Sequence, residues 1–183
     1  MCYKDEQITS HVLTNCPSRR GEYIKRYDEV GKEIYKTILL KYGIIQTKQI
    51  EPLTIENEKI TVILNQVVIK GKDKGRQTDI TVINKEKSYG IIIDVSIVGK
   101  YRQEKTYKEK LEKYKNTNLT IKQSHGLQAI QIIPVIITID GLIHKKTIIE
   151  ISKAGIEVDW NKAIKKVLFI NQEMIIRCYS QRP

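Results

Sequence analysis

The stretch RQTDITVINKEKSYGIIIDVSI, residues 76–97, decides the fold of this chain. It contains the apolar, β-branched run of residues 78–83 and all but the last residue of a second run, residues 89–98, with a short polar break between them. This pattern predicts two antiparallel strands joined by a hairpin loop. Each strand carries one carboxylate, Asp79 or Asp94, and a turn centred in the polar break would place the two side chains opposite each other on one face of the sheet.

Two carboxylates in this arrangement need a positive charge nearby to offset their mutual repulsion. Like charges directly opposed in a sheet are destabilising, and a buried carboxylate without a partner is costly or becomes protonated. A hard divalent cation such as Mg²⁺ would compensate, because it prefers carboxylate and water oxygens as ligands. The alternative is that Asp79 ends its strand in solvent while Asp94 pairs with a lysine.

A basic helix is predicted directly after the second strand, over residues 102–116. Lys110 and Lys113 lie three positions apart, so they share a helix face, with Tyr107 and Tyr114 beside them. A helix that folds back over the sheet would aim an ammonium group at the two carboxylates, where it could stabilise charge on a phosphate or orient a water. The alternative is an ordinary solvated basic helix.

The other segments complete an α/β pattern. The predicted helices cover residues 22–42, 145–153 and 160–168, and residues 173–179 are expected to form a strand or a helix. Further strands are expected at 60–64, 67–69 and 129–139, the last beginning after Pro134 because proline is confined to strand edges and bulges. Residues 44–58 are expected to form an extended connection, and residues 71–75 a turn. The order predicts a mixed sheet flanked by helices.

Composition narrows the class of protein. The chain has 183 residues and 21.3 kDa, which suits one main domain, and 32 lysines and arginines against 21 acidic residues give a net charge of +11. This charge favours a polyanionic partner, either nucleic acid or an anionic membrane. We expect a soluble intracellular protein, because no long apolar run or secretory signal is present. Three cysteines without such a signal argue against a disulfide framework and for metal binding or thiols.

Taken together, Asp79, fourteen residues, Asp94, and then Lys110-Leu111-Glu112-Lys113-Tyr114 resemble the restriction-like endonuclease domain of early-branching non-LTR retrotransposons. That family has the PD-(D/E)XK nuclease fold, so the resemblance implies a restriction-endonuclease-like core. The basic residue that usually precedes the first aspartate is present as Arg76, but Thr78 replaces the usual proline. Ser96 stands where the classical lysine would be, and the family's displaced helical lysine matches Lys110.

The resemblance extends to both ends of the chain. Cys2, eight residues, His11, four residues, and Cys16 match the last three ligands of the family's Cys-Cys-His-Cys knuckle. The first cysteine is missing, so residues 1–20 resemble a truncated zinc-knuckle remnant, with the endonuclease domain at 21–183; zinc is expected only if the knuckle is complete. Arg26-Tyr27-Asp28 resembles the family's Arg-His-Asp/Asn signature. The stretches IIPVIITIDGLIHKKTI and KKVLFINQEMIIRCY are similar to its late strand and closing helix.

The resemblance implies a metal-dependent DNA endonuclease that nicks target DNA to prime reverse transcription of a non-LTR retrotransposon. It implies Asp79 and Asp94 as ligands of Mg²⁺ or Mn²⁺, with Lys110, Lys113 and Tyr114 completing the catalytic set. Glu33 or Asp28 would supply a further ligand. Contacts with DNA would come from Arg26, Arg76 and Lys108.

The implied partners are the DNA target, the reverse transcriptase domain of the parent polyprotein and the element's RNA. The implied location is nuclear, after synthesis in the cytoplasm, and dimerisation stays open. Two alternatives remain: a basic nucleic-acid-binding domain without catalysis, and a junction-resolving nuclease of the same fold that acts as a symmetric dimer. Membrane attachment is disfavoured, because no terminal amphipathic helix with a broad apolar face is present.

Overall fold

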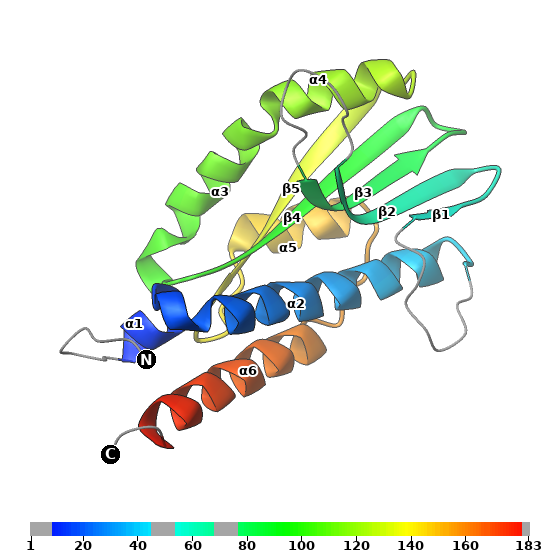
Figure 1. Ribbon diagram of the computed structural model, residues 1–183. Helices are drawn as coiled ribbons and strands as arrows, with labels where there is room; N and C mark the ends of the chain where they lie inside the picture. Colours follow the sequence, from blue (N-terminus) through cyan, green and yellow to red (C-terminus); the bar gives the residue numbers. More distant parts are fainter. Residues whose placement is uncertain (1–8, 45–53, 68–76, 181–183) are drawn as a thin grey trace.

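The computed structural model of the protein describes residues 9–44, 54–67 and 77–180. The chain in these ranges forms helices and strands in the order α1 (Thr9–Thr14), η1 (Pro17–Arg19), α2 (Arg20–Lys41), β1 (Thr54–Glu56), β2 (Ile60–Val67), β3 (Gln77–Asn84), β4 (Tyr89–Val98), η2 (Lys100–Arg102), α3 (Gln103–Lys113), α4 (Lys115–Ser124), β5 (Ala129–Thr138), α5 (Lys145–Lys153) and α6 (Trp160–Ser180). Figure 1 shows a sheet between helices above and below it.

The sheet is mixed. Its order is β1-β2-β3-β4-β5, and the first four strands are antiparallel, whereas β5 lies parallel to β4. The connection from β4 to β5 runs through α3 and α4, as a parallel pair requires a crossover. The prediction of a mixed sheet flanked by helices is therefore confirmed, and so is the predicted hairpin, with both of its strands.

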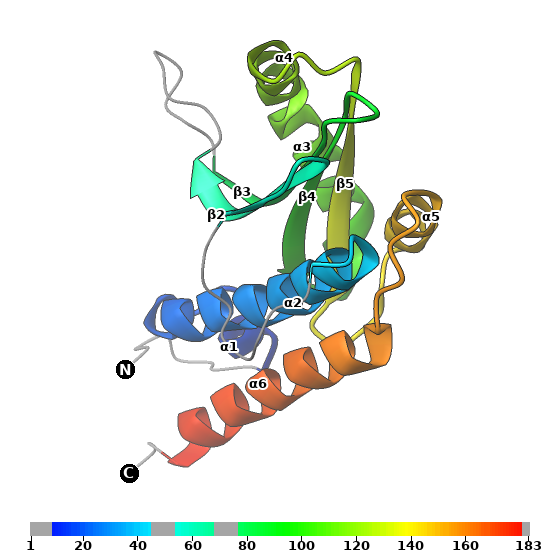
Figure 2. The same cartoon turned by 90° about the vertical axis from the view of Figure 1, so that its right-hand side faces the viewer.

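The two faces of the sheet are covered by different helices. Alternate residues such as Ile80 and Ile93 join the large core formed with α2, α5 and the start of α6. The residues between them, including Ile83 and Ile92, pack instead with Tyr114, Ile121 and Leu127 of the α3–α4 connection. Figure 2 shows the sheet edge-on, with α3 and α4 on one side and α2 and α6 on the other. This alternation determines which side chains of β3 and β4 can meet α3.

Helix α2 follows the predicted 22–42 pattern closely. Val30, Ile34 and Ile38 are fully buried at helical spacing against the sheet. The helix ends where Gly43 takes a positive φ of 66°, a conformation that favours glycine after a last helical turn.

In β4, the absence of a side chain at Gly90 leaves space for Leu127. A Cβ added at Gly90 would lie 3.0 Å from the Leu127 side chain.

Some boundaries differ from the predictions. The strand over residues 129–138 does not begin after Pro134 but runs through it, because β5 is an edge strand and the missing N–H points away from β4. The segments 160–168 and 173–179 form one helix, α6. The extended connection predicted at 44–58 contains the short strand β1. The turn at 71–75 and residues 68–69 of the predicted strand lie outside the described residues.

The helix predicted over residues 102–116 is divided in two. Helix α3 ends at Lys113 and α4 begins at Lys115, with Tyr114 between them at φ −98° and ψ 2°. The break follows from packing, since the Tyr114 side chain is fully buried against the sheet. This junction brings the last turn of α3 directly over β4.

Candidate active site

The observed register of the hairpin is the one expected for a turn centred in the polar break between β3 and β4. Ile80 pairs with Ile93 and Ile83 pairs with Gly90, so Asp79 comes one position before the first pair and Asp94 one position after it. There the Asp79 carboxylate accepts the Val95 N–H at 2.5 Å, in the position where a backbone carbonyl would continue the ladder. By the alternation of the strands, both aspartates lie on the face covered by α3.

Asp94 is the centre of a buried polar cluster. Its carboxylate is only 2% exposed and contacts three donors from the end of α3. Lys113 Nζ lies 3.0 Å from Oδ1, which also accepts a hydrogen bond from the Tyr114 hydroxyl. Lys110 Nζ forms an ion pair with Oδ2. The predicted convergence of a helical lysine on the acidic pair is therefore present in the structure.

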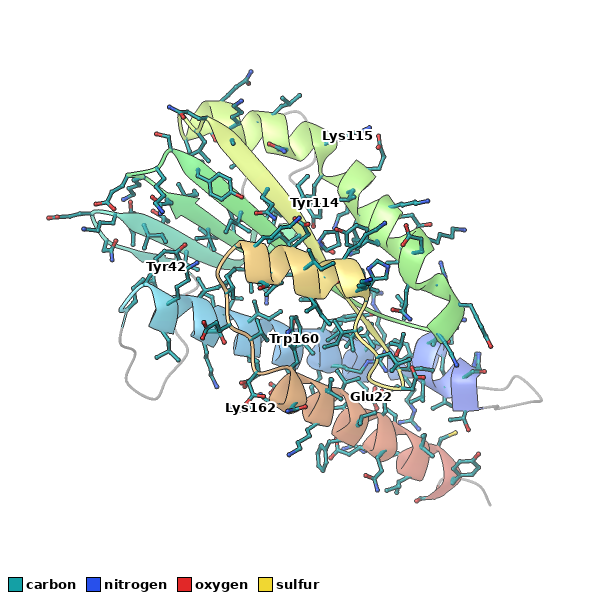
Figure 3. All side chains as sticks on the ribbon, turned by 180° about the vertical axis from the view of Figure 1, so that it is seen from behind. Glu22, Tyr42, Tyr114, Lys115, Trp160 and Lys162 are labelled. Atoms are coloured by element: carbon teal, nitrogen blue, oxygen red, sulfur yellow. The ribbon has the colours of Figure 1, made fainter. Side chains whose placement is uncertain are left out.

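Helix geometry explains why these three side chains meet one carboxylate. Lys110, Lys113 and Tyr114 stand at positions i, i+3 and i+4, which face the same way on a helix. The Tyr114 hydroxyl accepts a hydrogen bond from Lys113 Nζ at 2.7 Å and lies 3.1 Å from the Gln77 carbonyl at the start of β3. Figure 3 labels Tyr114 at the junction of α3 and α4. Tyr114 thus ties the helix junction to both strands of the hairpin.

The electrostatics of Asp79 differ from those of an ordinary surface acid. Burial, and then the negative charge of Asp94, raise the pKa of Asp79 from 3.8 to about 6. The Val95 N–H and the ammonium groups of Lys110 and Lys113 lower it in part. The cluster thus holds two carboxyl and two ammonium groups, and the negative charge on Asp79 is the least well compensated.

The donor set suits a small divalent cation. Two carboxylates on one face, one of them with a raised pKa, offer the oxygen ligands that Mg²⁺ and Mn²⁺ take in proteins, with the remaining positions left for water and substrate. Within the described residues, no group of three or more His, Cys, Asp or Glu side chains is arranged to hold a metal. A cation at Asp79 and Asp94 would therefore rely on oxygens from outside this acidic pair.

Glu33 does not join the site, so the prediction of Glu33 as a further metal ligand there is wrong. It lies on α2, the helix that also carries Asp28, and the apolar side of α2 packs against the opposite face of the sheet. The Glu33 carboxylate pairs with Lys166 at 2.7 Å and Lys162 at 2.9 Å, both on α6. Its physical role is to bind α6 to α2.

Arg26 was predicted to contact DNA, and this prediction is also wrong. Its side chain is 1% exposed and donates hydrogen bonds to Asn171 Oδ1 at 2.5 Å and to the Leu13 carbonyl at 3.1 Å. These contacts connect α2 with α1 and α6. Residues on α1 and α6 also pack together nearby, through Val12 and Met174 among others. Arg26 is an internal anchor.

We expect Arg26→Met to lower the free energy of unfolding by about 2 kcal/mol, since two buried acceptors lose their donors while the side-chain volume is largely kept. Urea denaturation measures this. The exposed Arg102→Met serves as a control and should change stability little. Comparable losses for both variants would contradict the anchoring role.

The structure describes some, but not all, of the other residues that were predicted to bind nucleic acid or zinc. Arg76 and Cys2 lie outside the described residues. Lys108 is exposed on α3, 3.8 Å from Glu104, so it is accessible to a ligand. Cys16 is buried, with its sulfur 3.0 Å from Ser18 Oγ, and His11 is half-buried on α1. The zinc knuckle stays a prediction.

The sequence did not predict two main-chain contacts of the site. The Gln77 carbonyl and the Val95 N–H are main-chain groups, for which residue identity carries no signal. Beside the site, His144 stacks on Tyr107 of α3 with ring centroids 4.9 Å apart, and its Nε2 lies 3.0 Å from Glu104. His144 therefore joins the start of α5 to α3.

Comparisons with models of known protein families and with curated proteins gave no match. In the described part of the chain, no helix has both the length and the apolar character needed to cross a membrane.

Proposed function

We propose that this chain is a metal-dependent DNA endonuclease domain with a restriction-endonuclease-like core, of the kind that nicks target DNA for a non-LTR retrotransposon. The observation that carries the proposal is the convergence of Lys110 and Lys113 on Asp94, with Asp79 beside it on the same face. The order of a hairpin, a helix and a parallel strand, with both acids on the hairpin, supports the same core.

Each residue of the cluster has a chemical role in this proposal. Asp79 and Asp94 would hold Mg²⁺ or Mn²⁺, which when bound supplies Lewis-acid activation of a phosphate and a water of lowered pKa. Lys110 and Lys113 bring two ammonium groups to the same point, where they would neutralise charge on the phosphate oxygens. Tyr114 holds Lys113 and Asp94 in place through its hydroxyl.

The charge of the chain supports a nucleic-acid substrate. With a net charge of +11, the protein attracts a polyanion, and exposed cations such as Lys108 contact backbone phosphates without selecting a sequence. By this proposal the reverse transcriptase of the parent polyprotein and the element's RNA are partners, and the site of action is nuclear.

One observation favours a second function, nucleic-acid binding without cleavage. Both oxygens of Asp94 are already occupied by cations of the chain itself, which neutralise the carboxylate without a metal. Such a cluster could serve stability alone. A domain of this kind would bind DNA equally well with and without a divalent ion.

Supercoiled plasmid incubated with the protein and Mg²⁺ or Mn²⁺ distinguishes the two functions. The proposal expects conversion to the open circular form, stopped by a chelator. Plasmid binding in a mobility-shift assay without any metal-dependent nicking would support the second function instead.

The Tyr114 hydroxyl gives a finer test of the site. We expect Tyr114→Phe to nick plasmid roughly tenfold more slowly than the parent, because a hydrogen bond to a charged group is lost while the buried ring remains. The matched control is Tyr107→Phe, one helical turn before Lys110, which should keep the parental rate. Equal rates for both variants would remove Tyr114 from the site.

A further inference from the structure

Helix α5 and the residue before it cover the second half of the outer edge of β5. In the second half, the Ile136 N–H donates to Thr147 Oγ1 at 3.1 Å, and the Thr147 hydroxyl donates to the Pro134 carbonyl at 2.8 Å. The His144 N–H donates to the Ile136 carbonyl at 2.9 Å. Even-numbered residues of β5 therefore direct their backbone groups outward, away from β4, and α5 satisfies those groups from Pro134 onward.

The described part of the chain provides no such cover for the first half of the same edge. By the same alternation, Ile130 and Ile132 direct their backbone groups outward. Asn118 Nδ2 lies 3.4 Å from the Ile130 carbonyl, which agrees with this direction. Among the residues that the structure describes, no other hydrogen bond reaches this outer edge before Pro134. The edge is a short template for strand pairing.

A groove of about 540 Å³ runs beside this edge, between α4 and β5. Its apolar wall is formed by Leu119, Ala129, Ile130 and Ile132, and its polar rim by Lys115, Asn118, Lys122 and Gln128. Among the residues that the structure describes, none with a carboxylate side chain lines the groove. Figures 1 and 2 both show α4 next to the beginning of β5.

The two lysines on the rim differ in how far they are neutralised. Lys115 pairs with Glu112 at 2.7 Å, whereas Lys122 forms no ion pair with any other described residue. Leu119, between them on α4, is 61% exposed. The groove thus combines open backbone groups, exposed apolar surface and positive charge that is not balanced locally.

We propose that this groove binds an extended acidic peptide segment, which adds as a sixth strand along residues 129–132 of β5. Backbone pairing would supply affinity, and the set of alternate side chains that faces α4 would place apolar groups against Leu119 and Ile132 and carboxylates beside Lys115 and Lys122. A second copy of this chain fits less well, since two such edges would bring like charges together. Thr147 and Pro134 limit the pairing to the first half of the strand.

Fluorescence anisotropy tests the charge requirement with a labelled eight-residue peptide in which every second residue is threonine and the residues between are glutamate, valine, glutamate and valine, so that valine and glutamate share one face of the strand. We expect the parent protein to bind the peptide saturably. The Lys122→Glu variant should bind it about tenfold more weakly, because one attractive charge contact becomes repulsive. Lys165→Glu, the same change at an exposed site on α6, should bind like the parent. A peptide with lysine in place of glutamate should not bind measurably. Equal binding of the two peptides, or equal loss in both variants, would overturn the proposal.

A pair of N-methylated peptides tests strand addition itself. One carries methyl groups on the threonine amides and the other on the valine and glutamate amides, so each blocks one edge of the same strand. Pairing with β5 uses one edge only, so one peptide should bind like the parent peptide and the other at least about tenfold more weakly. Equal affinities would overturn strand pairing. Single-stranded DNA that binds in place of the peptide, and depends on Lys122, would also overturn it, because the groove would then be a nucleic-acid site.

Discussion

Asp94→Asn is expected to lower the rate of metal-dependent nicking of supercoiled plasmid roughly 1,000-fold. Asp94 is the carboxylate on which Lys110, Lys113 and Tyr114 converge, and the amide of asparagine carries no charge to hold a cation. A unit charge pair at 4 Å is worth about 4 kcal/mol at an effective dielectric constant of 20. Since each 1.36 kcal/mol changes a rate tenfold, a loss of this size follows.

Asp140→Asn is the matched control for this substitution. Asp140 is an exposed aspartate just after β5, and the change removes the same charge from the chain. It should nick plasmid at the parental rate. Thermal unfolding of both variants shows whether the fold is kept. If a folded Asp94→Asn protein nicks as fast as Asp140→Asn, the catalytic site lies elsewhere.

The geometry of the Asp79–Asp94 pair was predictable because it depends on local rules. The alternation of side chains along two strands and the short polar break between them determine a register, and the observed pairing of Ile80 with Ile93 agrees with it. Similarly, a spacing of three and four residues determines that Lys110, Lys113 and Tyr114 share a helix face. These inferences need only neighbours in sequence.

The errors at Arg26 and Glu33 arise from contacts between distant segments. The pattern of α2 shows which side of the helix is apolar, but it does not show that α6 covers part of the other side. One signal was available: Glu29 and Glu33 are four apart, and so are Lys162 and Lys166, which they meet across the two helices. Complementary charge spacing of this kind indicates that two helices pack together rather than that either binds a ligand.

The sequence pattern also did not predict the break between α3 and α4 at Tyr114. The periodicity of residues 102–116 continues through this position, and nothing in the propensities of neighbouring residues demands an end there. The burial of the tyrosine ring beside Ile92 and Ile121 determines the break, because it turns α4 along the sheet. Tertiary packing here overrides a weak local preference.

Asp79→Asn is expected to stabilise the protein at neutral and higher pH. The pKa of Asp79 is raised from 3.8 to about 6 by burial and by Asp94, so the folded state binds a proton more tightly than the unfolded state. The stability that this proton contributes is fully present below about pH 4 and is lost as the pH rises through about 6. Asparagine stays neutral and can still accept the Val95 N–H.

The expected gain for Asp79→Asn in the free energy of unfolding is about 3 kcal/mol at about pH 8, from 1.36 kcal/mol per pKa unit, and it should vanish near pH 4. Urea denaturation at a series of pH values measures it. Asp140→Asn, at an exposed position, should show no such pH dependence. Mg²⁺ or Mn²⁺ should raise the stability of the parent at high pH but not that of Asp79→Asn, since a bound cation relieves the same uncompensated charge. If Asp79→Asn is less stable than the parent at high pH, groups of the protein already compensate the charge of the Asp79 carboxylate. That result would contradict a cation site between Asp79 and Asp94.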